Sequence, residues 1–284
     1  MQIALHPMQA MAKNTRLANL VSNILYPDSC SPSHTNPQIP LQQQYKSVKN
    51  LDNTPQHTAD PSCLLQRNGY SIHLVNSLKQ RIKASTLIKR MYASRGYQTE
   101  QASVFGAKPN QYAFEARQSG RLIGTLTLTI DTGKGLLADT LYKTELDQFR
   151  QQGRKLFEVS KLAFSPETSS KEIFASMFHI AHIFGHYLHG ASDAIIEINP
   201  RHACFYKRML GFKQLGEQRT CPRVDAPAVL LQLNMEYMKE QISALAGNVG
   251  SGGRDIYPYF FSKSEEEQVF GVVQQIKPDT RLMA

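Results

Sequence analysis

One carboxylate lies in a stretch of the sequence that is otherwise mostly apolar. Glu158 is the third residue of Leu156–Phe164, which reads LFEVSKLAF. Withdrawing a carboxylate from water disfavours its charged form, so we expect the pKa of Glu158 to rise towards neutrality. A group with such a pKa can accept a proton from a reacting substrate near pH 7. The alternative is a structural ion pair, in which an arginine on an adjoining element neutralises Glu158.

Four histidines recur along a segment that we expect to be one helix, from about 166 to 189. His179, His182, His186 and His189 fall on one side of it when each residue turns by about 100°. The apolar residues of this helix centre on the opposite side, which predicts a solvated histidine ridge facing away from the core. The pattern supplies no carboxylate or cysteine to complete a metal site, so we expect no metal. Docking onto an acidic partner is the alternative role for the ridge.

The elements that must position these groups alternate between helices and strands. The expected order is a basic helix (76–94), a hairpin (111–131), a helix (138–152), a strand (156–164), the histidine helix, a strand (194–198), a helix opened by Pro200 and closed by Gly211, and two strands (212–218 and 228–235). This order predicts one mixed α/β domain whose sheet has six or seven strands.

Composition divides the 284 residues into three parts. Residues 1–66 are expected to form a disordered or loosely helical N-terminal extension, because most of this segment is rich in Pro, Gln, Asn, Ser and Thr. Residues 67–240 would form the domain. Residues 241–284 would form a Gly-rich linker and a C-terminal helix, which Ser264 and Glu267 would cap.

The balance of charge and the cysteines limit the partners and the compartment. A net charge of +9 favours acidic partners, namely nucleic acid, anionic lipid or an acidic protein. The four cysteines form neither a CxxC pair nor a zinc-ligand spacing, and the N-terminus lacks the apolar run of a signal peptide. We therefore expect a reduced, cytoplasmic protein with no membrane span. A short amphipathic helix over 8–25 is the candidate for peripheral membrane contact.

The order of elements resembles that of the GNAT acyltransferases. The segment 205–212 (FYKRMLGF) also resembles their late helix and turn, where an aromatic pair precedes Gly-Phe. The resemblance implies an α/β (α+β) GNAT fold with a mixed, mostly antiparallel sheet flanked by helices. Its two central parallel strands, here 156–164 and 194–198, would splay apart. The pantetheine arm of an acyl thioester would then pair with the backbone groups exposed in the gap.

The turn after the first of these strands departs from the pattern of GNAT enzymes that use coenzyme A. Those enzymes carry a glycine-rich turn whose backbone amides hold the pyrophosphate. This sequence has SPETSS at 165–170, with Glu167 near the start of the helix. A donor without pyrophosphate fits better, and we expect acyl carrier protein, whose acidic surface would dock on the surplus of basic residues. We expect no nucleic acid partner.

Two further segments resemble particular families of acyltransferases. The segment 158–164 (EVSKLAF) is similar to the Glu-x-Ser-Arg-Phe segment of acyl-homoserine-lactone synthases, with Lys161 in place of the arginine. A longer resemblance, over 89–235, is to the FeeM-type N-acyl amino acid synthases. It includes GTLTLTID at 124–131, GLLAD at 135–139 and PRH at 200–202.

This resemblance implies that the amino group of an amino acid attacks a long-chain acyl thioester. Glu158 would be the base, and Tyr206 would protonate the leaving thiolate, the alternative for Tyr206 being a core aromatic. The residues expected to bind substrate are Arg90, Asp131, Ser160, Lys161 and Arg201. We expect no tightly bound cofactor, because the acyl-phosphopantetheine thioester of acyl carrier protein is the donor.

Two alternative functions stay open at this point. One is a lactone signal synthase that uses S-adenosylmethionine, although the paired acidic residues of those enzymes have no clear match between Gly96 and Asn110. The other is a non-catalytic GNAT-like module that binds acyl carrier protein or an acyl ligand. The presence of both Glu158 and Tyr206 favours an enzyme.

Overall fold

The computed structural model describes residues 60–67, 69–104, 108–166, 170–249 and 255–276. Positions 1–59 of the expected N-terminal extension, and the helix expected within them, lie outside the described residues. Within these ranges, every helix is too short or too polar to cross a bilayer.

One sheet of nine strands runs through the described part of the chain. Its order is β1-β2-β3-β4-β5-β6-β9-β7, and β8 pairs with β9. All of these pairs are antiparallel except β5 with β6. The strands are β1 (Cys63–Arg67), β2 (Tyr70–Leu74), β3 (Gln111–Gln118), β4 (Arg121–Ile130), β5 (Leu156–Phe164), β6 (Asp193–Ile198), β7 (Lys213–Gln214), β8 (Arg219–Cys221) and β9 (Ala226–Asn234). The mixed, mostly antiparallel sheet expected from the sequence is confirmed.

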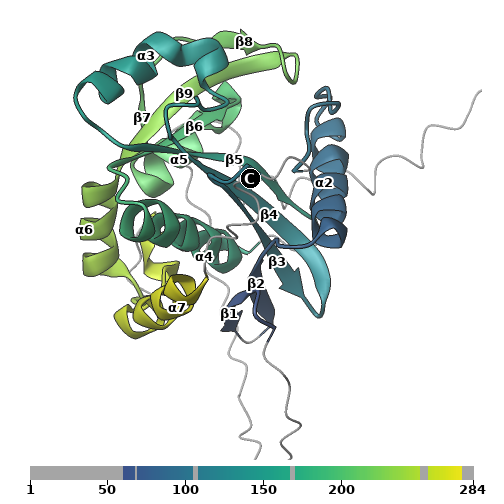
Figure 1. Cartoon of the computed structure of the whole chain (residues 1–284), viewed down its shortest axis with the longest axis vertical. Helices are drawn as coiled ribbons and strands as arrows, with labels where there is room; N and C mark the ends of the chain where they lie inside the picture. Colours follow the sequence, from purple (N-terminus) through teal and green to yellow (C-terminus); the bar gives the residue numbers. More distant parts are fainter. Residues whose placement is uncertain (1–59, 68, 105–107, 167–169, 250–254, 277–284) are drawn as a thin grey trace, which may run out of the picture.

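The helices are α2 (Leu78–Ala93), α3 (Asp139–Gln151), α4 (Lys171–His182) with its π-helical continuation η1 (Ile183–Leu188), η2 (Pro200–His202), α5 (Ala203–Leu210), α6 (Met235–Leu245), η3 (Tyr257–Tyr259) and α7 (Lys263–Gln275). Figure 1 shows α4, α6 and α7 gathered together, with α2 apart from them along β4. Gly211 ends α5 in a left-handed conformation (φ 81°), which glycine adopts without steric cost.

Alternate residues of β5 show how the helices divide between the two faces of the sheet. Leu156 packs with residues of α3 and Ala163 with residues of α2, whereas Phe157 belongs to the large core that includes α4 and α5. In a regular strand, Leu156 and Ala163 would point to opposite faces. A β-bulge between Ser160 and Ala163 brings them to the same face. Helices α2 and α3 therefore cover one face, and α4 and α5 cover the other.

The parallel strands β5 and β6 pair over three residues only, and the last pair is Glu158 with Ile195. Beyond it, β5 continues to Phe164 along β4, and β6 continues to Ile198 along β9. The two strands therefore separate directly after Glu158, as the resemblance predicted. One edge of each strand is left with backbone groups that no neighbouring strand takes up.

The C-terminal segment packs onto the main core. Phe260 and Phe261 are fully buried, and they stack on the ring of His179. The Nδ1 atom of His179 accepts a hydrogen bond of 2.9 Å from the backbone N–H of Phe261, and its Nε2 lies 3.1 Å from Glu266. His182 is buried as well, and the other two histidines are partly buried. The prediction of a solvated histidine ridge was therefore wrong, because η3 and α7 cover a face that the helical pattern left open.

The sheet begins at Cys63, so the domain boundary expected at 66–67 falls inside β1. Arg67, the last residue of β1, donates hydrogen bonds of 2.9 and 3.0 Å to the two carboxylate oxygens of Glu265. Glu265 also forms the capping box of α7 together with Ser262, two positions earlier than the sequence suggested. The first strand is thus held by the last helix.

Candidate active site

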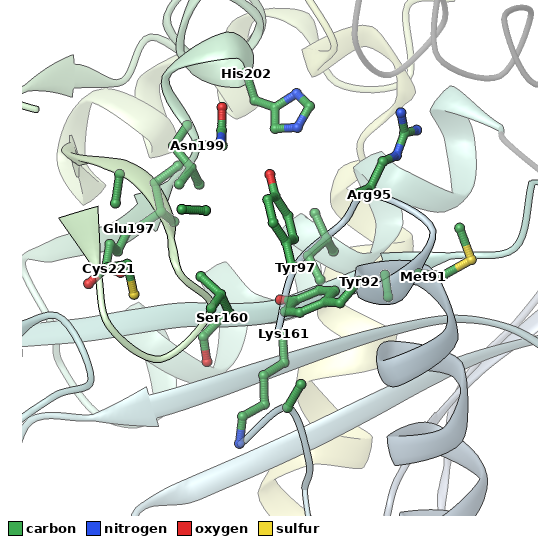
Figure 2. Close-up of a pocket in the computed structure, with 18 of the residues that line it drawn as sticks. Met91, Tyr92, Arg95, Tyr97, Ser160, Lys161, Glu197, Asn199, His202 and Cys221 are labelled. Atoms are coloured by element: carbon green, nitrogen blue, oxygen red, sulfur yellow. The ribbon is translucent and has the colours of Figure 1, made fainter. Parts of the chain in front are cut away.

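A cavity of about 530 Å³ opens where β5 and β6 separate. Its walls come from the end of α2, the segment 94–102, β5, β6, η2, α5 and the turn between β8 and β9. Figure 2 shows the side chains of several of these elements converging on one space, with Tyr97 near its centre. The cavity follows β5 from Glu158 to beyond the end of the strand at Pro166.

Glu158 lies in the wall of this cavity and is only 1% exposed. Its carboxylate accepts hydrogen bonds from the backbone N–H groups of Leu137 (2.6 Å) and Ala138 (3.2 Å), at the start of α3. Burial, opposed by these two bonds, raises the pKa of Glu158 to about 7. Among the described residues, no arginine forms a salt bridge with Glu158. The arrangement matches a proton acceptor better than a structural ion pair.

A second carboxylate, Glu197 in β6, lines the same cavity and was missed by the sequence analysis. Its Oε1 accepts a hydrogen bond of 2.6 Å from Arg223, which also donates to the carbonyl oxygen of Leu137. The other oxygen, Oε2, is buried and has no hydrogen-bond partner among the described residues. The signal was present, because Glu197 interrupts the apolar strand DAIIEI just as Glu158 interrupts its own strand.

Ser160 and Lys161, both expected to bind substrate, lie at the bulge of β5. Ser160 lines the cavity, and its hydroxyl oxygen is buried with no hydrogen-bond partner in the described part of the chain. Lys161 has a positive φ of 52°, and its ammonium donates to the carbonyl oxygen of Ser103. Burial lowers the pKa of Lys161. Figure 2 shows the Lys161 side chain running away from the centre of the cavity, and its contact with Ser103 ties β5 to the neighbouring loop.

Tyr206 borders the cavity from α5 and is 4% exposed. Its ring contacts those of Phe174, Phe178, Phe205 and Phe212 at centroid distances of 5.4 to 6.3 Å. Its position at the cavity wall is compatible with the expected role as an acid. The ring is also part of the core, which is the alternative that the sequence allowed for Tyr206.

Arg201 lies at the mouth of the cavity, on η2. Its Nη2 donates a hydrogen bond of 2.7 Å to the hydroxyl of Tyr97, and its guanidinium lies 5.3 Å from the centre of that ring. Its Nε donates to Nε2 of His202 at 3.1 Å. Burial and the positive charges of Arg201 and Arg95 lower the pKa of His202 to about 3, so this histidine is neutral at physiological pH.

The structure does not bring Arg90 and Asp131 to this cavity. Arg90 lines a separate, smaller cavity of about 290 Å³ beside the end of β5, together with Arg121 and Ser165. Asp131 accepts a hydrogen bond of 2.6 Å from Arg150 and holds the turn after β4. Asp131 therefore forms an ion pair within the fold and does not line the main cavity, where substrate contacts were expected.

The described residues contain no group of three or more His, Cys, Asp or Glu side chains that could hold a metal ion. Cys63 and Cys221 are free thiols.

The splayed strands and the buried carboxylate beside them define the class of this protein, a GNAT-type N-acyltransferase. The solved structure of FeeM, an N-acyl amino acid synthase from uncultured soil microbes, is similar with a TM-score of 0.56 and 27% identity. That match covers 60% of this chain and 93% of FeeM. The family model described as N-acyl amino acid synthase FeeM matches residues 83–234, more than half of the chain. The chain belongs to the FeeM family.

Two further solved structures are similar to this chain at lower identity. An acyl-CoA N-acyltransferase from Pseudomonas aeruginosa is 13% identical with a TM-score of 0.42, covering 57% of this chain and 98% of that one. The acyl-homoserine-lactone synthase LasI is 9% identical with a TM-score of 0.40, covering 58% of this chain and 89% of that one. Comparison with curated protein sequences gives no match.

Proposed function

We propose that this N-acyltransferase moves a long acyl chain from the thioester of acyl carrier protein to the amino group of an amino acid. The observation that carries the proposal is the position of Glu158, a buried carboxylate with a pKa near 7 at the point where β5 and β6 part. A donor arm that pairs with the free edge of β5 would bring its thioester carbonyl close to Glu158. Membership of the FeeM family supports an amino acid as the acceptor.

The chemistry follows from these positions. The ammonium group of the acceptor gives a proton to Glu158, and the free amine attacks the thioester carbonyl to form the C–N bond. Backbone N–H groups at the open edge of β5 would stabilise the oxyanion. When the C–S bond breaks, the attacking nitrogen loses its second proton and the leaving thiolate takes one up. Tyr206, which lines the cavity, would relay this proton by protonating the sulfur and being reprotonated from the nitrogen. Glu158 then loses its proton to water.

The acyl chain would lie on the apolar side of the cavity. Phe164 and Phe178 line this side, and Phe174 and Phe205 stand behind them in the core. Gly124 makes this wall possible, because a Cβ atom there would approach the Phe164 ring to 2.6 Å. Only a residue without a side chain lets Phe164 take that position.

The donor part of the proposal is supported by the surroundings of Ser165. From Val159 to Ser165 the free edge of β5 measures about 20 Å at 3.3 Å per residue. An extended phosphopantetheine arm has a comparable length, so its phosphodiester would reach the small cavity lined by Arg90 and Arg121. One phosphodiester between two guanidinium groups suits acyl carrier protein, and the sequence has no glycine-rich turn for a pyrophosphate.

The test is to incubate the full chain with a long-chain acyl carrier protein thioester and a mixture of amino acids, and to identify products by mass spectrometry. An N-acyl amino acid is the expected product, and Glu158→Gln is the matched inactive control. A lactone formed only when S-adenosylmethionine is added would overturn the amino acid acceptor. Tight binding of the carrier protein with no product from any amine would show a binding module.

A further inference from the structure

The mouth of the main cavity carries positive charge that the fold itself leaves without a carboxylate. Arg95, at the end of α2, and Arg201, on η2, both line the cavity and are exposed. Neither forms a salt bridge with another residue of the described chain. Both lie close enough to His202 to lower the pKa of that histidine. Figure 2 shows Arg95, His202 and the hydroxyl of Tyr97 grouped in the upper part of the view.

Arg201 is held in place by its neighbours. Asn199 caps η2 by accepting a hydrogen bond from the backbone N–H of Arg201 at 3.2 Å. The hydroxyl of Tyr97 and the ring nitrogen of His202 fix the guanidinium at Nη2 and Nε. These contacts leave Nη1 without an internal partner among the described residues. A guanidinium restrained in this way loses little conformational freedom when it binds an anion.

The interior wall of the same cavity carries the opposite charge. Glu158 and Glu197 lie there, and Glu197 Oε2 and the hydroxyl of Ser160 are buried polar atoms without a partner in the described chain. A buried oxygen of this kind costs free energy unless a ligand supplies the missing hydrogen bond. An ammonium group has three donors and is suited to such a set of oxygens.

We propose that Arg201 and Arg95 bind the free carboxylate of the acceptor and thereby turn its ammonium group towards Glu158 and Glu197. The cavity would then select α-amino acids with a free carboxylate over amines, amino acid amides and esters. This inference rests on the proposed function, because it assigns the two ends of the amino acid acceptor to the two ends of the same cavity.

The other anion that could reach these arginines is the phosphodiester of the donor arm. The distribution of charge favours the acceptor, because Arg95 and Arg201 line the same cavity as the two carboxylates, whereas Arg90 and Arg121 line the separate cavity beside the end of β5. The two assignments differ in the substrate whose KM depends on Arg201.

The test compares each amino acid that yields a product with its primary amide, which keeps the amine and loses the anionic carboxylate. For the wild type we expect kcat/KM to be about 10- to 100-fold higher with the free acid, as for a charge-assisted hydrogen bond. Arg201→Gln and Arg95→Gln should raise KM for the amino acid and remove most of this preference. KM for the acyl carrier protein thioester should stay unchanged. Arg208→Gln, on the exposed side of α5, removes the same charge and serves as the control.

Equal rates with acid and amide in the wild type would overturn the inference while leaving the acyltransferase function intact. A rise in KM for the carrier protein alone would assign these arginines to the donor phosphate instead. If no amino acid gives a product, the proposed function itself falls. Arg201→Lys, which keeps the charge without the fork of donors, should give an intermediate preference, and melting temperatures identify any variant that fails to fold.

Discussion

Arg223 donates a hydrogen bond of 2.6 Å to Glu197 and, from the same position, lowers the pKa of Glu158. Glu197 acts in the opposite direction, because its negative charge raises the pKa of Glu158. The proton affinity of the candidate base therefore depends on burial and on two neighbours of opposite charge.

Replacing either of these two neighbours should shift the pH–activity profile, and the two shifts should be in opposite directions. Glu158 must be ionised to accept a proton, so activity should rise with pH through about 7. Glu197→Gln removes the charge that raises this pKa, and the acidic limb should move to lower pH. Arg223→Leu removes the charge that lowers it, and the limb should move to higher pH. Initial rates between pH 5 and pH 9 measure both shifts.

The acceptor's own amine also titrates, but neither substitution alters its pKa in solution. Shifts in the same direction for both variants would contradict the electrostatic account. Because Arg223→Leu leaves Glu197 buried without its partner, its melting temperature must be measured alongside, and a loss of several kcal/mol is expected.

Glu158→Gln should lower kcat by about 10²-fold or more, the usual scale for loss of a general base. Glu240→Gln, on the exposed side of α6, is the control and should keep full activity. Raising the pH should partly restore the activity of Glu158→Gln, because more of the acceptor amine is then unprotonated. A stable Glu158→Gln variant with wild-type kcat would rule out the base role.

The same substitution has a stability signature. The pKa of Glu158 is raised in the folded protein from 4.5 to about 7, so the folded state binds this proton more tightly than the unfolded chain. That contribution is complete below pH 4.5 and is lost as the pH rises through 7. The free energy of unfolding of the wild type, taken relative to that of Glu158→Gln, should therefore be about 3 kcal/mol lower at pH 8 than at pH 4.5. Chemical unfolding of both proteins at the two pH values measures it; a pH-independent difference would point to an ion pair.

The donor proposal predicts a much higher kcat/KM with acyl carrier protein thioesters than with acyl-CoA of the same chain length. Replacing Arg90 and Arg121 together by Gln should raise KM for the carrier protein thioester and weaken its dependence on salt. The matched control is the double variant Lys79→Gln and Lys83→Gln, which removes the same charge elsewhere on α2. Equal efficiency with both donors would remove this part of the proposal.

A truncation separates the extension from the sheet. A chain that begins at Asp60 should fold and keep its kcat, because the described sheet starts after it. A chain that begins at Gly69 loses β1 with the buried Leu64 and Leu65, at a cost of about 1.5–3 kcal/mol for each side chain. Thermal unfolding of the two proteins measures the difference. A cut at the domain boundary expected from the sequence, between 66 and 67, would divide the strand.

The sequence predicted those elements whose order and local signals are strong. The hairpin, the strand that contains Glu158, and the helix between Pro200 and Gly211 all appear where they were expected. Glu158 was found because its charge conflicts with its apolar neighbours. The same argument applied to Glu197 would have found the second carboxylate of the cavity.

The contacts that the sequence left out join parts of the chain that lie far apart. Nothing in the pattern of α4 indicates that Phe261 and Glu266 contact His179, because these residues are more than 70 positions away. The pairing of Arg201 with Tyr97, over 104 positions, is equally invisible to local reasoning. Helical periodicity identifies the apolar face that a helix packs against the core. It does not identify a second face that is covered by a distant segment of the chain.

The bond between Arg67 and Glu265 spans 198 positions of the chain and has a consequence for synthesis. During synthesis β1 is made before the other strands of the described sheet, and α7 is made after all of them. The contact between Arg67 and Glu265 therefore cannot form until the whole described sheet has been synthesised. Until then, Glu172 is the carboxylate partner that is available to Arg67. A product cut short before Glu265 therefore lacks the contact by which α7 holds β1, although every strand of the described sheet has already been made.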